Sequence, residues 1–370
     1  MNGLFFELLQ VAIGNRKSLT RQLSDDEWAS LYSECEKQAL LGVAFAGVER
    51  LPKEQCPPFD VLAEWVHDAQ VAKDRNELLS KRCHEVCKIL DRDGFYSCIL
   101  KGQSNLANYP EKLRESRTAG DIDVLCWPKD SMKGYMDVIR YAHSISPEVM
   151  KGEKIEVLYH HVDWEYQGGI VEIHFRPSYF NSPWYNWRFQ KWWRGTVYPI
   201  EDDLGIITAP VSFNVVYQLV HIYRHLFNEG IGLRQLLDYY FVLKTFWEVG
   251  MERLEVREKC LEQIEHFGMK RFASAVMYVL QTVFAMPDEY LLYPQDEKRG
   301  CFLLNEIMLA GNFGFYDERN VINANESYLK RFIRRQKRFS RFLIQYPSEV
   351  IWGPYFTVKQ RLWRVIHGWK

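Results

Sequence analysis

The amino-acid sequence predicts an α+β protein in which a mixed sheet with helices lies between mainly helical segments. Apolar side chains recur at helical spacing in residues 4–90 and again from about 210 to 345. Between 95 and 177 the pattern changes to short apolar or alternating runs of strand length. With 370 residues and 47% hydrophobic content, the chain can bury a large core. We therefore expect a helical segment over 1–93, an α/β core over 94–200 and a helical domain with a basic tail over 201–370.

Helices are expected on both sides of the core. The first covers Leu4–Ile13 and stops at Gly14, and the acidic run Asp25-Asp26-Glu27 marks the start of a second. Pro57-Pro58 breaks the chain before a long helix over 60–93. Beyond the core, Pro210 precedes a long apolar-periodic run, and further helices are expected at Ile231–Val249, Glu252–Phe267 and Phe272–Phe284.

The core is expected to alternate strands with short helices. Gly168-Gly169 predicts a hairpin turn between two alternating runs. Short helices are expected at 103–109, which Pro110 ends, and at Ser131–Ala142. The expected strands are Phe95–Leu100, Ile122–Trp127, Ile155–Tyr159, Val162–Tyr166 and Ile170–Phe175.

The composition argues against secreted and membrane-spanning classes of protein. The eight cysteines include no C-x-x-C pair, and no basic residue precedes the apolar run at Leu4–Ile13. No window approaches the roughly 18 uninterrupted apolar residues of a transmembrane helix. We therefore expect a cytoplasmic protein with reduced cysteines.

The charge of the chain is distributed unevenly. From Lys330 to Lys370 there are eleven Lys and Arg residues and a single acidic residue, Glu349, although the net charge of the chain is −1. Three interpretations of this basic tail are open. It forms a solvated helix pair over packed aromatic side chains, it binds a polyanion such as tRNA, or it lies on an anionic membrane surface.

The most informative motif lies between Leu100 and Asp123. A buried strand ends in Lys101-Gly102, and the next strand begins with Asp121 and Asp123. Side chains at positions i and i+2 of a strand point to the same face, so the two aspartates form a carboxylate pair beside a glycine turn. Such a pair can hold Mg²⁺ against a nucleoside triphosphate.

A third oxygen ligand is expected from a later strand. Glu172 and His174 alternate with Val171 and Ile173, so they share the polar face of the strand after the hairpin. Glu172 is therefore the candidate that completes a site for two Mg²⁺ ions.

A second polar cluster contains His160, His161, Asp163 and His174. Imidazole and carboxylate ligands also suit Zn²⁺ or Fe²⁺. Because adjacent residues of a strand point to opposite faces, we expect only one of His160 and His161 to join His174. The alternatives to a transition-metal site are orientation of Glu172 or simple packing.

The ordered set of motifs carries a resemblance. It comprises Leu100-Lys101-Gly102, Tyr109-Pro110, Arg117 with Gly120-Asp121-Ile122-Asp123, His161, Val171-Glu172-Ile173-His174, His221, His225, Gly232-Leu233-Arg234 and Asp238. This set resembles the DNA polymerase β-like nucleotidyltransferase superfamily, and more specifically a bacterial family of uncharacterised nucleotidyltransferases. The likeness covers most of residues 1–350.

The resemblance implies a polymerase β-like core and a role for each matching residue. Two Mg²⁺ ions would be bound by Asp121, Asp123 and Glu172. His161 and His174 would orient Glu172, which completes the metal site or acts as the base. The residues implied to contact the nucleotide or its phosphates are Lys101, Gly102, Ser104, Arg117 and Asp238. The superfamily usually has a serine directly after the glycine, whereas Gln103 precedes Ser104 here.

The sequence thus predicts Mg²⁺-dependent transfer of NMP from an NTP to a hydroxyl of an acceptor. The acceptor is open between tRNA, a protein side chain and a small molecule such as an aminoglycoside or a sugar. Two other functions are alternatives. One is a catalytically silent nucleotide- or metal-binding module, and the other is a toxin-like or regulatory protein that binds RNA through residues 330–370.

Overall fold

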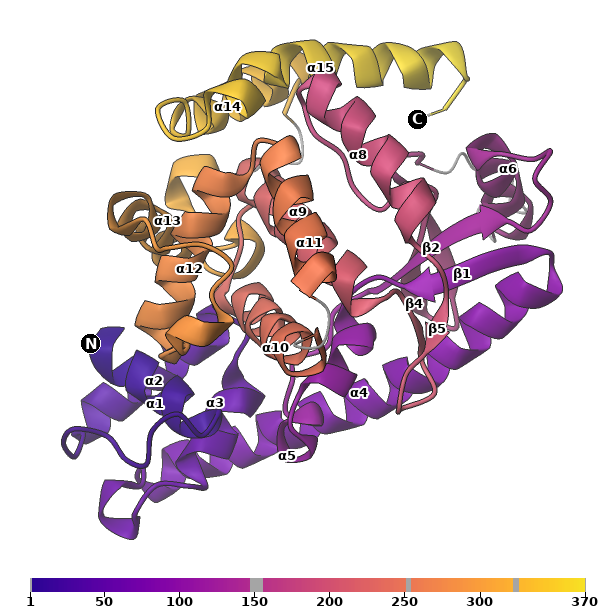
Figure 1. Ribbon diagram of the computed structural model, residues 1–370. Helices are drawn as coiled ribbons and strands as arrows, with labels where there is room; N and C mark the ends of the chain where they lie inside the picture. Colours follow the sequence, from indigo (N-terminus) through magenta and orange to yellow (C-terminus); the bar gives the residue numbers. More distant parts are fainter. Residues whose placement is uncertain (1, 147–155, 251–253, 322–325, 370) are drawn as a thin grey trace. The chain divides into compact units, whose positions relative to one another are not determined.

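The computed structural model describes residues 2–146, 156–250, 254–321 and 326–369 (Figure 1). Within these residues the chain forms helices and one six-stranded sheet of mixed strand direction, which confirms the predicted α+β class. The α-helices are α1 (Asn2–Ala12), α2 (Asp25–Lys37), α3 (Leu41–Val48), α4 (Phe59–Arg92), α5 (Glu111–Arg114), α6 (Tyr135–Ile145), α8 (Pro183–Thr196), α9 (Val211–Asn228), α10 (Leu233–Gly250), α11 (Leu254–His266), α12 (Lys270–Phe284), α13 (Glu297–Ala310), α14 (Tyr328–Ser340) and α15 (Pro347–Ile366).

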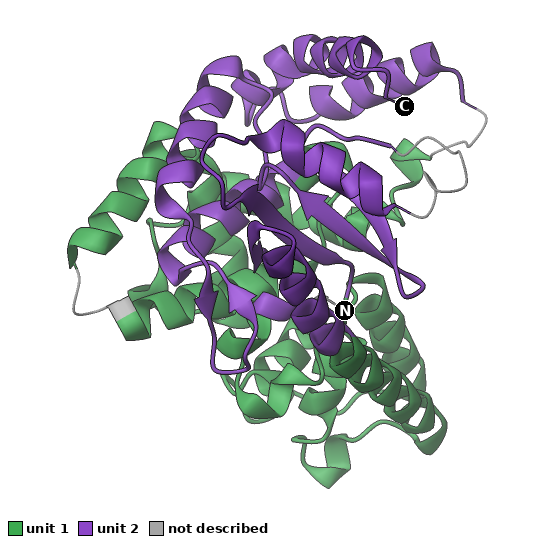
Figure 2. Ribbon diagram, turned by 90° about the vertical axis from the view of Figure 1, so that its right-hand side faces the viewer, with its two compact units in different colours: residues 1–78, 105–119, 225–322 green, residues 79–104, 120–224, 323–370 purple. Residues whose placement is uncertain are grey.

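Two compact units share the chain (Figure 2). Unit 1, in green, comprises residues 1–78, 105–119 and 225–322, and unit 2, in purple, comprises residues 79–104, 120–224 and 323–370. Each unit combines three separate stretches, so α4 contributes to unit 1 as far as Leu78 and to unit 2 beyond it. The division of the sequence after residues 93 and 200 follows chain order instead, and it stays a prediction.

The helices of unit 1 begin where local sequence signals place them. The Ser24 hydroxyl accepts a hydrogen bond from the Glu27 N–H, and the Glu27 carboxylate accepts one from the Ser24 N–H. This reciprocal capping explains why the acidic run starts α2. Further along the chain, α12 packs against α1, α10 and α13 through a broad apolar face. Burial of such faces is the main source of stability for helices of this length.

Unit 2 contains the sheet. Its strands lie in the order β3 (His161–Tyr166), β4 (Gly169–His174), β2 (Ile122–Pro128), β1 (Phe95–Ile99), β6 (Ile207–Thr208) and β5 (Ile200–Glu201). The inner strand β2 pairs antiparallel with β1 and parallel with β4. Its residues Ile122–Cys126 are buried, so this strand carries the Asp123 carboxylate into the interior of the unit.

The predicted hairpin joins β3 and β4, with a small shift in the turn. Tyr166 pairs with Gly169, which leaves Gln167 and Gly168 as the two loop residues, both at positive φ. Two residues at positive φ are typical of the type I′ turn, whose twist matches that of the flanking strands. Gly169 therefore belongs to β4 and not to the turn.

Other local predictions are confirmed in position but differ in detail. The segment expected to be helical at 103–109 is a 3₁₀-helix, η2 (Gly102–Asn108), and the helix expected from Ser131 begins at Tyr135. Of the strand expected at Ile155–Tyr159, the described part forms only a single bridge, between Val157 and Val162, and Ile155 lies outside the described residues.

None of the described helices is both long and apolar enough to cross a membrane. The eight cysteines are free, and six of them are buried, including Cys98 and Cys126 in adjacent strands.

Gly42 in α3 provides a test of the packing in unit 1. A Cβ atom at this position would overlap the backbone oxygen of Ser116, which cannot move away as a flexible side chain can. We expect Gly42→Ala to lower the free energy of unfolding by about 1–3 kcal/mol or more. The control is Gly3→Ala in α1, where nothing lies within 4 Å and the helix should gain up to about 1 kcal/mol. Urea denaturation measures both, and equal stabilities for the two variants would contradict the packing.

Candidate functional site

A row of three carboxylates crosses three neighbouring strands of the sheet. The strand register pairs Asp123 of β2 with Glu172 of β4, and Glu172 in turn with Asp163 of β3. Residues paired directly across strands project from the same face. The three side chains therefore lie side by side although they are separated by up to about fifty positions in the sequence.

Two imidazoles lie among these carboxylates. The Nε2 atom of His174 is 3.0 Å from Asp123 Oδ1 and 3.1 Å from Glu172 Oε2. His161 pairs with His174 in the register, and its two ring nitrogens are 3.4 Å from Glu172 Oε2 and 3.3 Å from Asp163 Oδ1. The predicted placement of Glu172 and His174 on one face is thus confirmed.

Lys101 adds an ammonium group at the end of β1. Its Nζ atom lies 3.0 Å from Asp123 Oδ1. Burial raises the pKa of Glu172, but the hydrogen bond from His174 and the charges of His161 and Lys101 outweigh it and lower that pKa overall. Burial opposes protonation of His174, and its hydrogen bonds to Asp123 and Glu172 reverse this, raising its pKa to about 9. Glu172 is therefore ionised near neutral pH, and His174 is held as an imidazolium.

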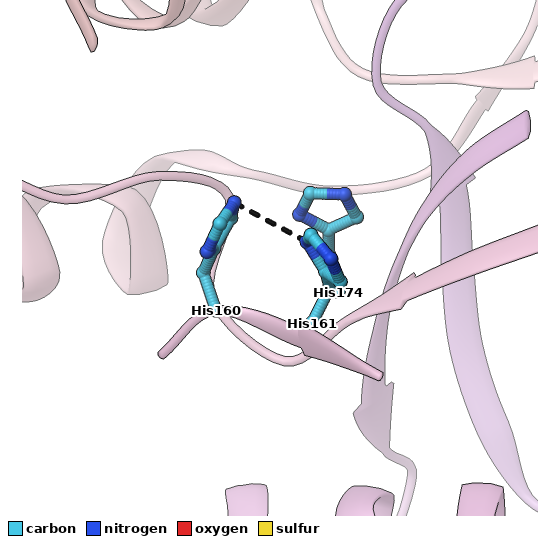
Figure 3. A group of neighbouring side chains, drawn as sticks. All are labelled: His160, His161 and His174. Atoms are coloured by element: carbon cyan, nitrogen blue, oxygen red, sulfur yellow. Dashed lines mark hydrogen bonds between the residues drawn. The ribbon is translucent and has the colours of Figure 1, made fainter. Parts of the chain in front are cut away.

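His160 also reaches this cluster, so the expectation that only one of the two adjacent histidines joins His174 is wrong. Figure 3 shows the three rings gathered together. The ring centroids are 5.1 Å apart for His160 and His174 and 5.0 Å apart for His161 and His174. His160 Nε2 lies 3.3 Å from His161 Nδ1. Alternation of faces holds only inside a strand. Because β3 begins at His161, His160 lies before the strand and is not bound by that rule.

Three groups of described side chains have donor atoms close enough to hold a metal ion. They are Asp123, Glu172 and His174; His161, Asp163 and Glu172; and His160, His161 and His174, each with donor atoms within 4.8 Å of one another. Glu172 belongs to the first two groups, so two neighbouring ion positions would share it. Asp121, which is exposed and directly precedes β2, belongs to none of them.

The predicted glycine turn follows β1, and its backbone conformation favours glycine. Gly102 has a φ of +66°, in the left-handed region that glycine adopts at little cost. Two residues on, the Ser104 side chain is buried, and its Oγ has no hydrogen-bond partner among the described residues. A buried hydroxyl left without a partner is costly, so such a group is a candidate for contact with a ligand.

A second buried hydroxyl was missed by the sequence analysis. Tyr217 of α9 is fully buried, and its hydroxyl has no partner among the described residues. Burial raises the pKa of Tyr217 well above its usual range, and the charges of Asp123 and Glu172 raise it further. No signal in the sequence identifies Tyr217, because it is one of several aromatic residues in an apolar-periodic helix. Its electrostatic coupling to Asp123 and Glu172 is evident only in the structure.

Arg117 and Asp238 lie in unit 1, where they bind each other. Arg117 Nε and Nη2 are each 2.7 Å from one of the two carboxylate oxygens of Asp238, and the Tyr109 hydroxyl donates a third hydrogen bond of 2.7 Å. Both charged side chains are almost completely buried. This bidentate pair satisfies both charged groups without a ligand. The predicted contacts of Arg117 with phosphate and of Asp238 with the nucleotide stay predictions.

Residues 24–285 match the protein family described as uncharacterised nucleotidyltransferase. The chain belongs to this family. No curated protein and no solved structure matches the sequence. The family description points to nucleotidyl transfer and so to an NTP as a substrate, and the clustered carboxylates and imidazoles of unit 2 are groups that can bind a metal ion.

The buried pair in this nucleotidyltransferase family member has a measurable structural role. Arg117→Met leaves the Asp238 carboxylate buried without its partner, which we expect to cost about 3–5 kcal/mol of unfolding free energy. The control is Lys73→Met. Lys73 pairs with Glu115 at 2.7 Å in the same unit, but the two side chains are 48% and 63% exposed, so the loss should be much smaller than for Arg117→Met. Denaturant titration compares the two variants. Similar losses of unfolding free energy would contradict the expectation that the buried Asp238 carboxylate depends on Arg117 for stability.

The raised pKa of His174 predicts a dependence of stability on pH. The folded-state pKa of about 9 lies above the ordinary value of 6.5, so the stabilisation is complete below about pH 6.5 and is lost as the pH rises through 9. For this buried group it amounts to at most about 3 kcal/mol. We expect the stability difference between wild type and His174→Gln, measured in EDTA, to shrink between pH 6.5 and 10. A difference that stays constant over this range would show that His174 is not protonated. His143→Gln, at an exposed site, is the control for the loss of a histidine side chain.

Proposed function

We propose that the chain is a Mg²⁺-dependent nucleotidyltransferase with a polymerase β-like core, which transfers NMP from an NTP to a hydroxyl of its acceptor. The observation that carries this proposal is the pairing of Asp123 with Glu172 across β2 and β4, next to Lys101 and the Gly102 turn. Membership of the uncharacterised nucleotidyltransferase family supports it independently.

The donor atoms fit a divalent cation. Carboxylate oxygens are the ligands that Mg²⁺ prefers, and the row Asp123, Glu172 and Asp163 supplies them on one face. Asp121, two residues before Asp123, would add a fourth from the exposed edge. The shared residue Glu172 would hold two ions, one with Asp123 and one with Asp163. When bound, such ions neutralise triphosphate charge and orient the reacting groups.

The chain's own residues would bind and orient the nucleotide. Lys101 would leave Asp123 and bind a phosphate oxygen of the nucleotide instead. A cation held by Asp123 would compensate the charge of that carboxylate and so free the Lys101 ammonium group. The Gly102 backbone allows a phosphate to approach closely, and the buried Ser104 hydroxyl would donate the hydrogen bond for which it has no described partner. His161 and His174 would hold Glu172 in place.

Glu172 is better suited to bind a cation than to remove a proton. The charges around it lower its pKa, and a carboxylate with a low pKa is a weak general base near neutral pH. We therefore assign Glu172 the role of metal ligand rather than that of base for the acceptor hydroxyl.

Ligand-induced stabilisation tests the proposal. An NTP with Mg²⁺ should raise the melting temperature of the wild type, since a ligand at 100 times its Kd adds about 2.7 kcal/mol to stability. Asp123→Asn and Lys101→Met should lose this shift relative to their own ligand-free melting temperatures. Asp130→Asn, two residues beyond the far end of β2, is the control and should keep this shift.

Two outcomes would count against this function. If no NTP shifts the wild type with Mg²⁺ or Mn²⁺, the site does not bind nucleotides. If an NTP binds but labelled nucleotide is transferred to no hydroxyl acceptor among tRNA, proteins and small molecules, the chain is a catalytically silent binding module.

A further inference from the structure

The helix α15 is fixed to unit 2 through one face. The buried Glu349 carboxylate accepts a 2.8 Å hydrogen bond from the Asn181 N–H and lies 3.5 Å from Arg224 Nη1. One turn further on, Gly353 lies so close to Phe339 of α14 that a Cβ atom would overlap its ring. These contacts anchor the basic tail to the body of the unit, so the surface of α15 that faces away from them has a defined orientation.

The opposite face of α15 is apolar and exposed. We call the row of six exposed apolar side chains on this face the apolar stripe. Successive members are four, three, four, three and one residues apart, and this spacing keeps them on one side of an α-helix. Its members are Ile351, Tyr355, Val358, Leu362, Val365 and Ile366, with exposed fractions between 48% for Tyr355 and Val358 and 78% for Ile366. A helix of a globular protein normally presents polar residues on the side away from the core. α15 therefore carries exposed apolar side chains opposite the face that buries Glu349, Gly353 and Phe356.

Basic residues border the apolar stripe. Lys359 and Arg361 are exposed within α15 itself. The neighbouring helix α14, which packs against α15, adds the exposed cations Lys330, Arg331 and Lys337 and two exposed apolar residues, Leu329 (65%) and Ile333 (57%). From residue 330 onwards the only acidic residue is Glu349, which lies in the first turn of α15 on its buried face. Arg364 is paired with Glu156 and is not counted among these cations.

We propose that the outer face of α14 and α15 binds the surface of an anionic lipid bilayer. The apolar stripe would enter the boundary between headgroups and acyl chains, and Lys359 and Arg361 would meet the lipid phosphates at its sides. The long stems of Lys and Arg allow their charges to remain in the headgroup layer while the helix lies flat. The combination of apolar and cationic side chains along α15 is what this environment requires.

Two other partners match the surface less well. A second copy of the chain would cover the apolar stripe, but it would place the cations of two identical faces against each other. A nucleic acid would satisfy the cations, but it would leave the aliphatic side chains Ile351, Val358 and Leu362 in water. An anionic bilayer satisfies both parts of the surface.

Sedimentation of the full chain with vesicles tests this proposal. We expect binding to vesicles of phosphatidylcholine with phosphatidylglycerol, weakened by salt, and little binding to phosphatidylcholine alone. The double variant Leu362→Glu/Ile366→Glu should bind the anionic vesicles about ten-fold more weakly or worse, as should Lys359→Gln/Arg361→Gln. Met132→Glu, which changes a 92% exposed apolar residue elsewhere in unit 2, is the matched control and should bind as wild type does.

Three results would overturn the proposal. The first is absence of binding to anionic vesicles, or undiminished binding by the Leu362→Glu/Ile366→Glu variant. The second is a dimer of the wild type in light scattering that this variant abolishes, which would assign the face to a second copy. The third is salt-sensitive RNA binding that depends on Lys359 and Arg361 but not on Leu362, which would assign it to a polyanion. All the substituted residues are exposed, and a melting curve confirms that each variant is folded before its vesicle binding is compared with that of the wild type.

Discussion

A carboxylate inside a protein costs several kcal/mol unless opposite charges and hydrogen bonds compensate for the lost hydration. Asp123 is such a group, at 1% exposure on the inner strand β2. Lys101 and His174 each approach its Oδ1 atom to 3.0 Å, one from the end of β1 and one from β4. The three strands must therefore keep their register, because a slip of one residue would turn each of these side chains to the opposite face. Whatever chemistry the face performs depends on this compensation.

Buried carboxylates are compensated by opposite charges and hydrogen bonds at two other places, where the role is structural. Asp238 is held by Arg117 and Tyr109, and Glu349 by Arg224 and the Asn181 N–H. In both places the carboxylate is compensated within its own unit, which is typical of a structural role. The carboxylates across β2, β4 and β3 differ, since their partners include two titratable imidazoles and since two buried hydroxyls, those of Ser104 and Tyr217, have no described partner. A buried hydroxyl without a partner is a candidate for contact with a ligand.

Much of the local structure and part of the candidate site could be predicted from sequence, because both depend on short-range rules. Alternation along β4 correctly placed Glu172 and His174 on one face, and the spacing of apolar residues indicated the long helices. The error at His160 has the same origin, since the rule of alternation was applied one residue before the strand begins. Tyr217 could not be found in this way, because nothing in a regular apolar helix shows which aromatic residue will lie near a carboxylate.

The sequence by itself determined which residue types were present and where local elements begin: a capping box at Ser24, a glycine turn at Gly102 and a tail with many cations. Each follows from interactions between residues a few positions apart. Only the tertiary structure decided which strands are neighbours, and so placed Asp163 beside Glu172 and paired Arg117 with Asp238. It also decided which side of α15 is buried, leaving the apolar stripe exposed. These outcomes depend on the burial of charge and of apolar area between segments far apart in the chain, which local spacing does not encode.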